Sequence, residues 1–340
     1  MDDFKSKLDS LISSEMISEK EYHNFLQRGV QYEKFGTEFP TLNNFFPDGI
    51  PIGASETFIR NLSFPYQETS YVCASIDEKY PRTYLYKLHE KHGGVLELLG
   101  GIRPVGDNLF GSLNRILLGS KAILLSADNL IANIEGIWNW RLFGNHLKKN
   151  NFATYNELEK FSKTKSHTNP IHIILARKRK TFERLNFLEK YKKNQIGIFN
   201  SDQVKIIIMT NDDGYDYASH VINPDDKIKY VVETDKSGNI DIKKCLQTLR
   251  MKFGISRMLN DGGRKMSNGM KQLGVLGGER ISYEPSLGVN HSPKNITEDM
   301  ILGRDGIGID GSAIKDSIVV FSQKIGTSKK ESLNLHVYPM

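Results

Sequence analysis

The sequence predicts an α/β fold with a largely buried, mostly parallel sheet. Short, continuous apolar runs recur through the middle of the chain, at Ala122–Ser126, Ile171–Leu175 and Val204–Met209. Such runs are typical of parallel strands, because helices cover both faces of a parallel sheet. Segments with apolar residues at helical spacing separate the runs, and this alternation indicates βα units.

The remaining elements follow the same two patterns. Late in the chain the predicted strands lie closer together with fewer helices between them, which favours an antiparallel edge. We expect helices at Asn108–Leu118, Tyr155–Phe161, Ile242–Phe253 and Arg264–Leu273. We expect further strands at Arg82–Leu88, Tyr230–Val232, Met258–Leu259, Ile281–Tyr283, Ser317–Phe321 and Leu333–Tyr338.

The N-terminal part of the chain has a different pattern. Leu8, Leu11 and Ile12 fall on one face of a first short helix, and Ser18 followed by Glu21 forms a capping box that would start a second. The stretch that follows, up to about residue 70, carries four prolines and is typical of an irregular connector. We therefore predict a helical extension with its connector over residues 1–75 and one main domain over residues 76–340.

Composition excludes several classes of protein. The chain has 340 residues, with 46 Lys and Arg against 40 Asp and Glu, a net charge of +6. Its two cysteines, Cys73 and Cys245, cannot build a disulfide framework. No apolar run approaches the length of a membrane helix, and the N-terminus lacks the apolar core of a secretory signal. We expect a cytoplasmic protein that does not enter a membrane.

The positive charge is concentrated in one segment. Arg177–Lys193 holds eight Lys and Arg against two Glu, and this cluster directly follows the predicted strand Ile171–Leu175. Ligands bind at the C-terminal ends of strands in α/β sheets, where Arg177, Lys178 and Arg179 could grip a phosphate. A solvated helix face fits the cluster equally well. Stacking aromatics are not interleaved with it, so we do not expect nucleic acid as a partner.

A glycine pair follows another predicted strand. Asp261, Gly262 and Gly263 stand between the strand at Met258 and the helix that starts at Arg264. Glycines at such a turn let the backbone approach a phosphate, and the helix N-terminus supplies free N–H groups. A tight turn without a ligand has the same sequence signature.

Metal chemistry is not indicated. His89 and His92 form an HxxH pair without the glutamate or the further ligands of a zinc site. Asp212 and Asp213 follow a strand and are typical of a turn. We expect no metal ion in the site.

Several of these segments occur in the order seen in one known family. The chain from about residue 80 to 290 resembles the reductase domain of bacterial riboflavin biosynthesis, which has a dihydrofolate-reductase-like fold. The family's K-x-x-x-S-L-D-G corresponds to Lys87 to Gly94, and its A-I-L-V-G-A-G-T to the segment ending Ser126-Ala127-Asp128-Asn129. Its P-L-x-x-V-L-x-x-R is similar to Pro170 to Arg177. Its L-L-x-E-G-G is similar to the segment ending Asp261-Gly262-Gly263.

The resemblance implies a three-layer fold and a reaction. The fold would have a mostly parallel central sheet with an antiparallel edge, preceded here by the helical extension. The family reduces 5-amino-6-ribosylaminouracil phosphate with NADPH, and relatives commonly form homodimers. By resemblance, Lys87 would contact the substrate or its phosphate, and Asp261 would hydrogen-bond a ligand or relay a proton. The cofactor would contact Ser126, Ala127, Asp128, Asn129, Arg177, Lys178, Arg179, Gly262 and Gly263.

Departures from the family pattern keep a second hypothesis open. The family's Ser and Asp after the first strand are Lys91 and Gly93 here. We do not expect residues 1–75 to form the deaminase half that often precedes the domain, because they are too few and lack its zinc ligands. A non-catalytic ligand-binding or protein-interaction relative of the same fold is therefore the alternative to an NADPH-dependent reductase.

Overall fold

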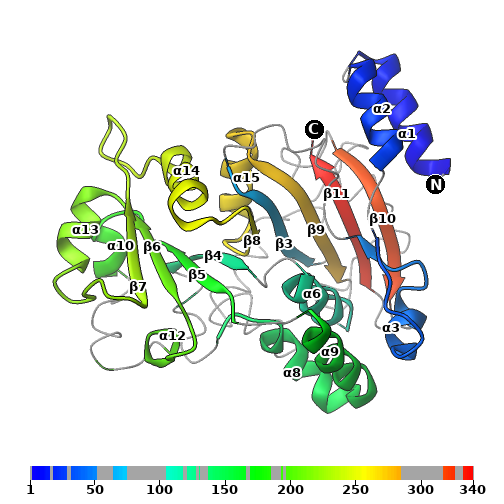
Figure 1. Cartoon of the computed structure of the whole chain (residues 1–340), viewed down its shortest axis with the longest axis horizontal. Coiled ribbons are helices and arrows are strands. Elements are labelled where there is room, and N and C mark those ends of the chain that lie inside the picture. The colour runs from blue at the N-terminus through cyan, green and yellow to red at the C-terminus, as the bar shows by residue number, and fades with distance from the viewer. Residues whose placement is uncertain are drawn as a thin grey trace.

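The chain folds around one large sheet (Figure 1). The computed structural model describes residues 2–15, 18–28, 32–51, 64–74, 105–117, 121–127, 130, 137–165, 169–184, 193, 197–284, 317–325 and 332–339. The described strands form a nine-stranded sheet in the order β10-β11-β9-β3-β8-β4-β5-β6-β7. Their bounds are β3 Tyr66–Ala74, β4 Ala122–Ser126, β5 Ile171–Leu175, β6 Ile206–Thr210, β7 Ile228–Val232, β8 Arg257–Asn260, β9 Leu276–Glu284, β10 Ser317–Ile325 and β11 Ser332–Pro339.

The sheet is parallel apart from one strand. From β9 to β7 every neighbouring pair is parallel, whereas β11 pairs antiparallel with both β9 and β10. Antiparallel pairing is thus confined to the β10 end of the sheet. This arrangement confirms the predicted α/β fold, with a mostly parallel central sheet and an antiparallel edge. The predicted bounds of β4 and β5 are confirmed residue for residue, and the predicted strand at Arg82–Leu88 lies outside the described residues.

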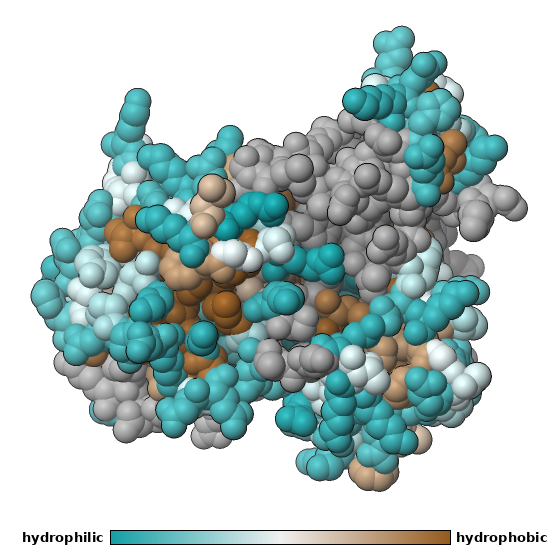
Figure 2. Space-filling view, in the orientation of Figure 1, coloured by the Kyte–Doolittle hydropathy of each residue, from teal (hydrophilic) through white to brown (hydrophobic). Residues whose placement is uncertain are grey.

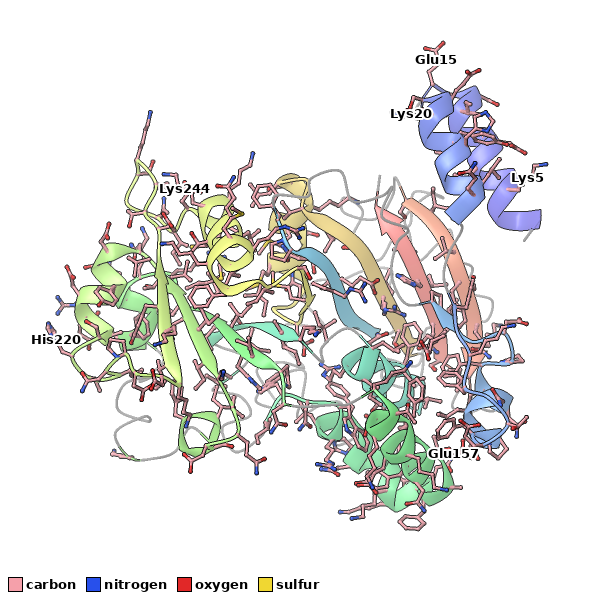
Figure 3. The ribbon with its side chains drawn as sticks, viewed as in Figure 1. Lys5, Glu15, Lys20, Glu157, His220 and Lys244 are labelled. Atoms are coloured by element: carbon pink, nitrogen blue, oxygen red, sulfur yellow. The ribbon has the colours of Figure 1, made fainter. Side chains whose placement is uncertain are left out.

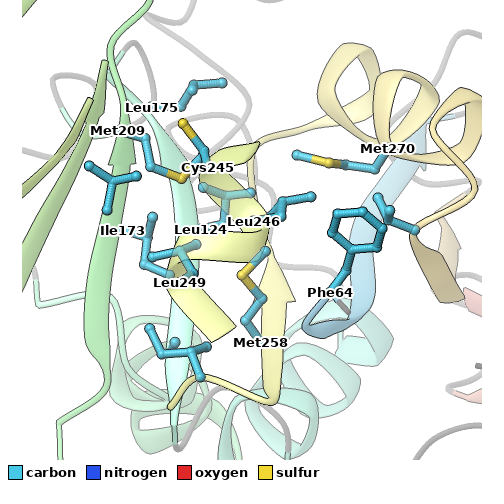
Figure 4. Packing of buried hydrophobic residues seen from close by; sticks show 14 of the residues in the cluster. Phe64, Leu124, Ile173, Leu175, Met209, Cys245, Leu246, Leu249, Met258 and Met270 are labelled. Carbon is cyan, nitrogen blue, oxygen red and sulfur yellow. The ribbon is translucent and has the colours of Figure 1, made fainter. Parts of the chain in front are cut away.

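Helices cover both faces of the sheet and make it the middle of three layers. One face of β4 to β6 packs through Ile123, Ile174 and Ile208. Its partners on this side are Phe182, Ile198, Ala218 and Ile222. The other face packs against α14 and α15 through Leu124, Met209, Leu246 and Met270 (Figure 4). The helices are α6 Val105–Leu117, α8 Arg141–Asn150, α9 Phe152–Thr164, α10 Arg179–Arg184, α12 Gly197–Asn200, α13 Asp212–Ala218, α14 Ile242–Phe253 and α15 Arg264–Gln272.

The N-terminal segments attach to the β10 end. Helices α1 (Asp2–Ser13) and α2 (Glu19–Arg28) confirm the two predicted helices and pack on Ile318 of β10. A short helix, α3 (Pro40–Phe45), docks on α9, where the Glu157 carboxylate accepts hydrogen bonds from the backbone N–H groups of Thr41 (2.9 Å) and Leu42 (2.8 Å) (Figure 3). Strand β1 (Tyr32–Glu33), which precedes α3, pairs antiparallel with β2 (Ile50–Pro51), which follows it.

The main sheet begins before residue 76, where we placed the start of the main domain. Strand β3 lies between β8 and β9 in the centre of the sheet, inside the segment that we predicted as a connector. The polar residues Gln67, Glu68 and Thr69 break the continuous apolar run by which a buried strand is predicted from sequence. All three are nevertheless fully buried. The division of the chain at residue 76 stays a prediction. Strand β3, which precedes that residue, nevertheless joins β9 to β8 in the main sheet.

A buried ion pair joins two neighbouring parallel strands, β3 and β9. Arg280 of β9 donates from Nε to Oε2 of Glu68 on β3 at 2.7 Å, and both side chains are fully buried. The carbonyl of Pro51 accepts a further hydrogen bond from Arg280, whose guanidinium lies 5.6 Å from the centre of the Phe110 ring. His336 of β11 lies 3.5 Å from Glu68, and burial holds the pKa of this histidine well below its usual range.

A second buried histidine fixes the segment before α8. His172 of β5 carries its proton on Nδ1, which faces the Pro170 carbonyl at 2.9 Å, because Nε2 accepts from the Trp138 N–H at 3.0 Å. Burial lowers the pKa of His172 to about 4, although the hydrogen bond to Pro170 opposes the shift.

On the face seen in Figure 2, the coloured residues at the periphery are mostly hydrophilic and apolar residues gather toward the middle. Glu15 and Lys20 lie at the free tip of the α1–α2 pair, away from the sheet (Figure 3). Within the described residues, no helix combines the length and apolar character needed to cross a membrane.

The ion pair of Glu68 yields a stability prediction. Arg280→Met should lower the free energy of unfolding by about 3–5 kcal/mol, because it leaves a buried carboxylate without its cation. The double variant Glu68→Leu with Arg280→Met should lose clearly less than the sum of the two single variants. Urea unfolding measures both, and strictly additive losses would show that the two side chains are not coupled.

His172 predicts a pH dependence. The folded-state pKa of about 4 lies below the ordinary 6.5, so the unfolded chain takes up the proton first as the pH falls. The contribution of His172 is complete above pH 6.5 and is lost between pH 6.5 and 4, by about 3 kcal/mol. His172→Gln keeps an acceptor for Trp138 but does not titrate there. Its unfolding free energy should fall less steeply over this range, and equal slopes would contradict the assignment.

Candidate functional site

The sheet order brings three of the predicted site segments to one edge. Strands β8, β4 and β5 are consecutive neighbours and run parallel, so their C-terminal ends lie side by side. Ser126 ends β4 and Ala127 follows it, the cluster from Arg177 follows β5, and Asp261 follows β8. Neighbouring strands are ~4.8 Å apart, so the ends of β8 and β5 are separated by roughly 10 Å. Lys87, Asp128 and Asn129 of the predicted site lie outside the described residues.

The turn after β8 leads directly into α15, as the sequence predicts. The Asp261 N–H donates to the Leu124 carbonyl at 2.8 Å, and Oδ1 of Asn260 accepts from the Gly262 N–H at 3.1 Å. Gly263 caps α15 at φ 79° and ψ 178°, and no side chain caps this helix N-terminus. This backbone conformation is essentially restricted to glycine. Among the described residues, a Cβ at Gly263 would meet no atom within 4 Å, so these residues leave space open at the helix start.

The Asp261 side chain is held by a buried cation. Nη2 of Arg115 on α6 donates to Oδ2 of Asp261, and the side-chain exposures are 2% and 12%. Nη1 of Arg115 donates to the Gly111 carbonyl at 3.1 Å, and the guanidinium lies 4.0 Å from the centre of the Phe143 ring. The pair fixes the orientation of the Asp261 carboxylate at the end of β8. It also removes the cost of an isolated guanidinium in the core.

The basic cluster is only partly available to a ligand. Arg179 is the first residue of α10, and its Nε donates to Glu183 at 2.8 Å, while its guanidinium lies 4.9 Å from the centre of the Tyr217 ring. The hydrogen bond to Glu183 raises the pKa of Arg179. Arg177 is exposed, and Lys178 is half-buried. We therefore expect Arg177 and Lys178, rather than Arg179, to meet an anion at this edge.

Helix α6 contributes to this site a residue that we did not predict from the sequence. Every residue from 108 to 116 is buried, including the polar side chains of Asn108, Ser112 and Arg115. These three residues are spaced i, i+4 and i+7, which places them in one polar stripe, whereas the buried Asn114 lies off this stripe. That stripe is the signal that could have identified Arg115 as the partner of a buried acid.

A second set of buried polar contacts holds α15 on the sheet. The Thr69 hydroxyl of β3 donates to the Asn260 carbonyl at 2.9 Å and lies 2.5 Å from the Ser267 hydroxyl on α15. The start of α15 is therefore fixed both by its own turn and by β3. Within the described residues, no group of three His, Cys, Asp or Glu side chains could hold a metal ion.

No family model matches the sequence, and no curated protein matches it significantly. Solved structures similar in fold include the riboflavin biosynthesis reductase Rib7 of Saccharomyces cerevisiae, with 13% identity, a TM-score of 0.39, and 88% of this chain and 98% of that chain covered. RibD of Acinetobacter baumannii has 15% identity and a TM-score of 0.42, with 82% of this chain covered, which spans 58% of that protein. A pyrimidine reductase-like protein of Corynebacterium diphtheriae has 11% identity and a TM-score of 0.41, with 88% and 98% covered. Similarity at this level assigns neither substrate nor cofactor.

The turn before α15 yields a prediction with a matched control. Gly263→Ala should lower the free energy of unfolding by about 1–3 kcal/mol through backbone strain, although there is room for the methyl group. Gly269→Ala in the same helix, where a Cβ also meets no atom within 4 Å, should be neutral or stabilising. Thermal unfolding of the two variants checks this, and equal effects would contradict the strained conformation of Gly263.

Proposed function

We propose that the protein is an NADPH-dependent reductase that acts on a small, phosphorylated heterocyclic substrate. The observation that carries the proposal is the convergence of Ser126–Ala127, Arg177–Lys178 and Asp261–Gly263 at one edge of the sheet. Ligands of open α/β sheets bind at this edge, outside the C-terminal ends of the strands. The family resemblance of these same segments supports the choice of NADPH.

The residues present at this edge fit a dinucleotide phosphate. The start of α15 offers backbone N–H groups and the positive end of a helix dipole, with open space at Gly263. Arg177 and Lys178 lie two strands away, at a distance of roughly 10 Å that a single dinucleotide can bridge. In this proposal the α15 N-terminus holds the pyrophosphate, and Arg177 and Lys178 hold the 2′-phosphate. Ser126 and Ala127 would contact the cofactor from the end of β4, which lies between β8 and β5.

The chain's own contribution is positioning. When bound, the nicotinamide ring supplies the hydride. Arg115 orients the Asp261 carboxylate, and we propose that Asp261 accepts a hydrogen bond from the bound ligand. Lys87 would hold the substrate phosphate, as the family resemblance implies. The buried contacts of Thr69 with Asn260 and Ser267 keep the α15 N-terminus in place for this task.

The second candidate is a ligand-binding relative without catalysis. It is favoured by the pairing of Asp261 with Arg115, which gives this carboxylate a structural role of its own. Both candidates predict nucleotide binding at the same edge. They differ in turnover, because only the reductase oxidises NADPH when a suitable heterocyclic substrate is added. The homodimer that the resemblance implies stays a prediction for both.

A binding experiment tests the cofactor site. The double variant Arg177→Ala with Lys178→Ala should bind NADPH at least ~10-fold more weakly, because each charge-assisted hydrogen bond contributes about 1.5–3 kcal/mol. NADH lacks the 2′-phosphate, so its affinity should change by less than about threefold. Isothermal titration calorimetry measures both.

The adjacent arginine provides the matched control. Arg179→Ala should leave the preference for NADPH intact, because Glu183 and Tyr217 already engage that side chain. Equal losses for NADPH and NADH in the double variant, or no binding of either nucleotide by the unaltered protein, would overturn the proposal.

A further inference from the structure

We propose a second ligand site, specific for a small oxyanion such as a phosphate or carboxylate group, at the opposite edge of the sheet. A polar cavity of about 380 Å³ lies where the segments leading into β5 and β6 meet the start of α8 and the end of α9. Its volume is within the range of small-molecule sites. The lining residues are Asn139, Trp140, Arg141, Ser162, Lys163, Asn169 and Gln203.

Three amide side chains in this cavity are oriented by one backbone group. The Arg141 N–H donates to Oδ1 of Asn139 at 2.9 Å, and a backbone N–H can only donate. Nδ2 of Asn139 must therefore donate to Oδ1 of Asn169, at 3.0 Å. Nδ2 of Asn169 in turn faces Oε1 of Gln203 at 3.4 Å. The Arg141 N–H thus determines, for these linked amide side chains, which atom donates and which accepts.

This assignment of donors and acceptors makes the cavity rich in donors. Each of the three amide oxygens already accepts a hydrogen bond. Each amide NH₂ group has two hydrogens, and it donates at most one of them to another of these amides. These hydrogen bonds do not use the second NH₂ hydrogen of Asn139, the second NH₂ hydrogen of Asn169, or the Nε2 hydrogens of Gln203. A ligand that only accepts hydrogen bonds, such as an oxyanion, complements this arrangement.

The charges on the lining have the matching sign. Arg141 and Lys163 are the two cations, and the N-cap residue of α8, Trp140, makes no side-chain capping hydrogen bond, so that Asn139 alone caps the Arg141 N–H. Glu159 opposes them through an ion pair with Arg141, but at 3.4 Å and with the Arg141 side chain 51% exposed this contact is weak. The Arg141 guanidinium also lies 5.4 Å from the centre of the Trp140 ring. An incoming oxyanion would displace Glu159 from Arg141 at little cost.

The cavity is preformed and separate from the proposed cofactor site. His172 binds the Trp138 N–H at the start of β5, which places Asn139 beside Asn169 before any ligand arrives. The cofactor residues lie at the other end of the same five-residue strand, roughly 17 Å away at ~3.3 Å per residue. The two sites can therefore be occupied and tested independently.

The two tryptophans of the chain give a local readout. The sequence contains only Trp138 and Trp140, and Trp140 lines the cavity while Trp138 belongs to the segment that His172 anchors. Intrinsic fluorescence of the full-length protein therefore reports on this place in the fold. Inorganic phosphate, citrate, a sugar phosphate and glucose serve as probes, titrated at constant ionic strength.

We expect saturable fluorescence changes with the anionic probes, at dissociation constants of about 1 mM or tighter, and none with glucose. Gln203→Glu places a negative charge in the cavity and should weaken anion binding at least tenfold, as should Arg141→Ala. Lys160→Ala, one turn before Lys163 on α9 and outside the cavity, is the matched control and should bind like the unaltered protein. Comparison of the probes shows whether the site prefers phosphate or carboxylate.

The double variant Arg177→Ala with Lys178→Ala distinguishes phosphate binding in this cavity from binding at the cofactor edge. It should keep the fluorescence change with phosphate. The proposal is overturned if the unaltered protein shows no saturable change with any anion. It is also overturned if Gln203→Glu binds phosphate as the unaltered protein does, or if the double variant loses the response.

Discussion

The ion pair between Arg115 and Asp261 is the interaction on which the candidate site depends. Helix α6 is buried over two and a half turns, and a guanidinium in such surroundings is costly unless a carboxylate meets it. That carboxylate stands at the end of β8, immediately before the glycines that start α15. Helix α6, the end of β8 and the open start of α15 are therefore held in one arrangement. The same pair that stabilises the core orients the edge at which we propose that the cofactor binds.

The sheet separates two surfaces of similar chemistry. At the C-terminal ends of β8, β4 and β5, glycine backbone and basic side chains face a single edge. At the start of β5 and β6, oriented amides and two cations line a preformed cavity. We propose that both surfaces bind anions, but with different groups. The first offers a helix N-terminus and flexible cations, and the second offers a fixed array of amide donors.

The sequence predicts the parts of the fold that depend on local pattern. Strands β4 and β5 and helix α14 have their predicted bounds, because continuous apolar runs and helical spacing are local signals. Strand β3 escaped prediction because its polar residues find partners about 200 positions away, at Asn260 and Arg280. The same holds for the candidate site. The turn Asp261–Gly263 and the basic cluster stand beside strands in the sequence and can be found there, whereas the Arg115 partner of Asp261 and the engagement of Arg179 by Glu183 require tertiary contacts.

The most direct test of the central claim is hydrogen–deuterium exchange of the full chain with and without saturating NADPH. The account predicts slower exchange at the C-terminal ends of β4, β5 and β8 and at the start of α15, with little change around Asn139 and Gln203. Protection confined to the opposite edge of the sheet, or no protection at the start of α15, would contradict the placement of the cofactor.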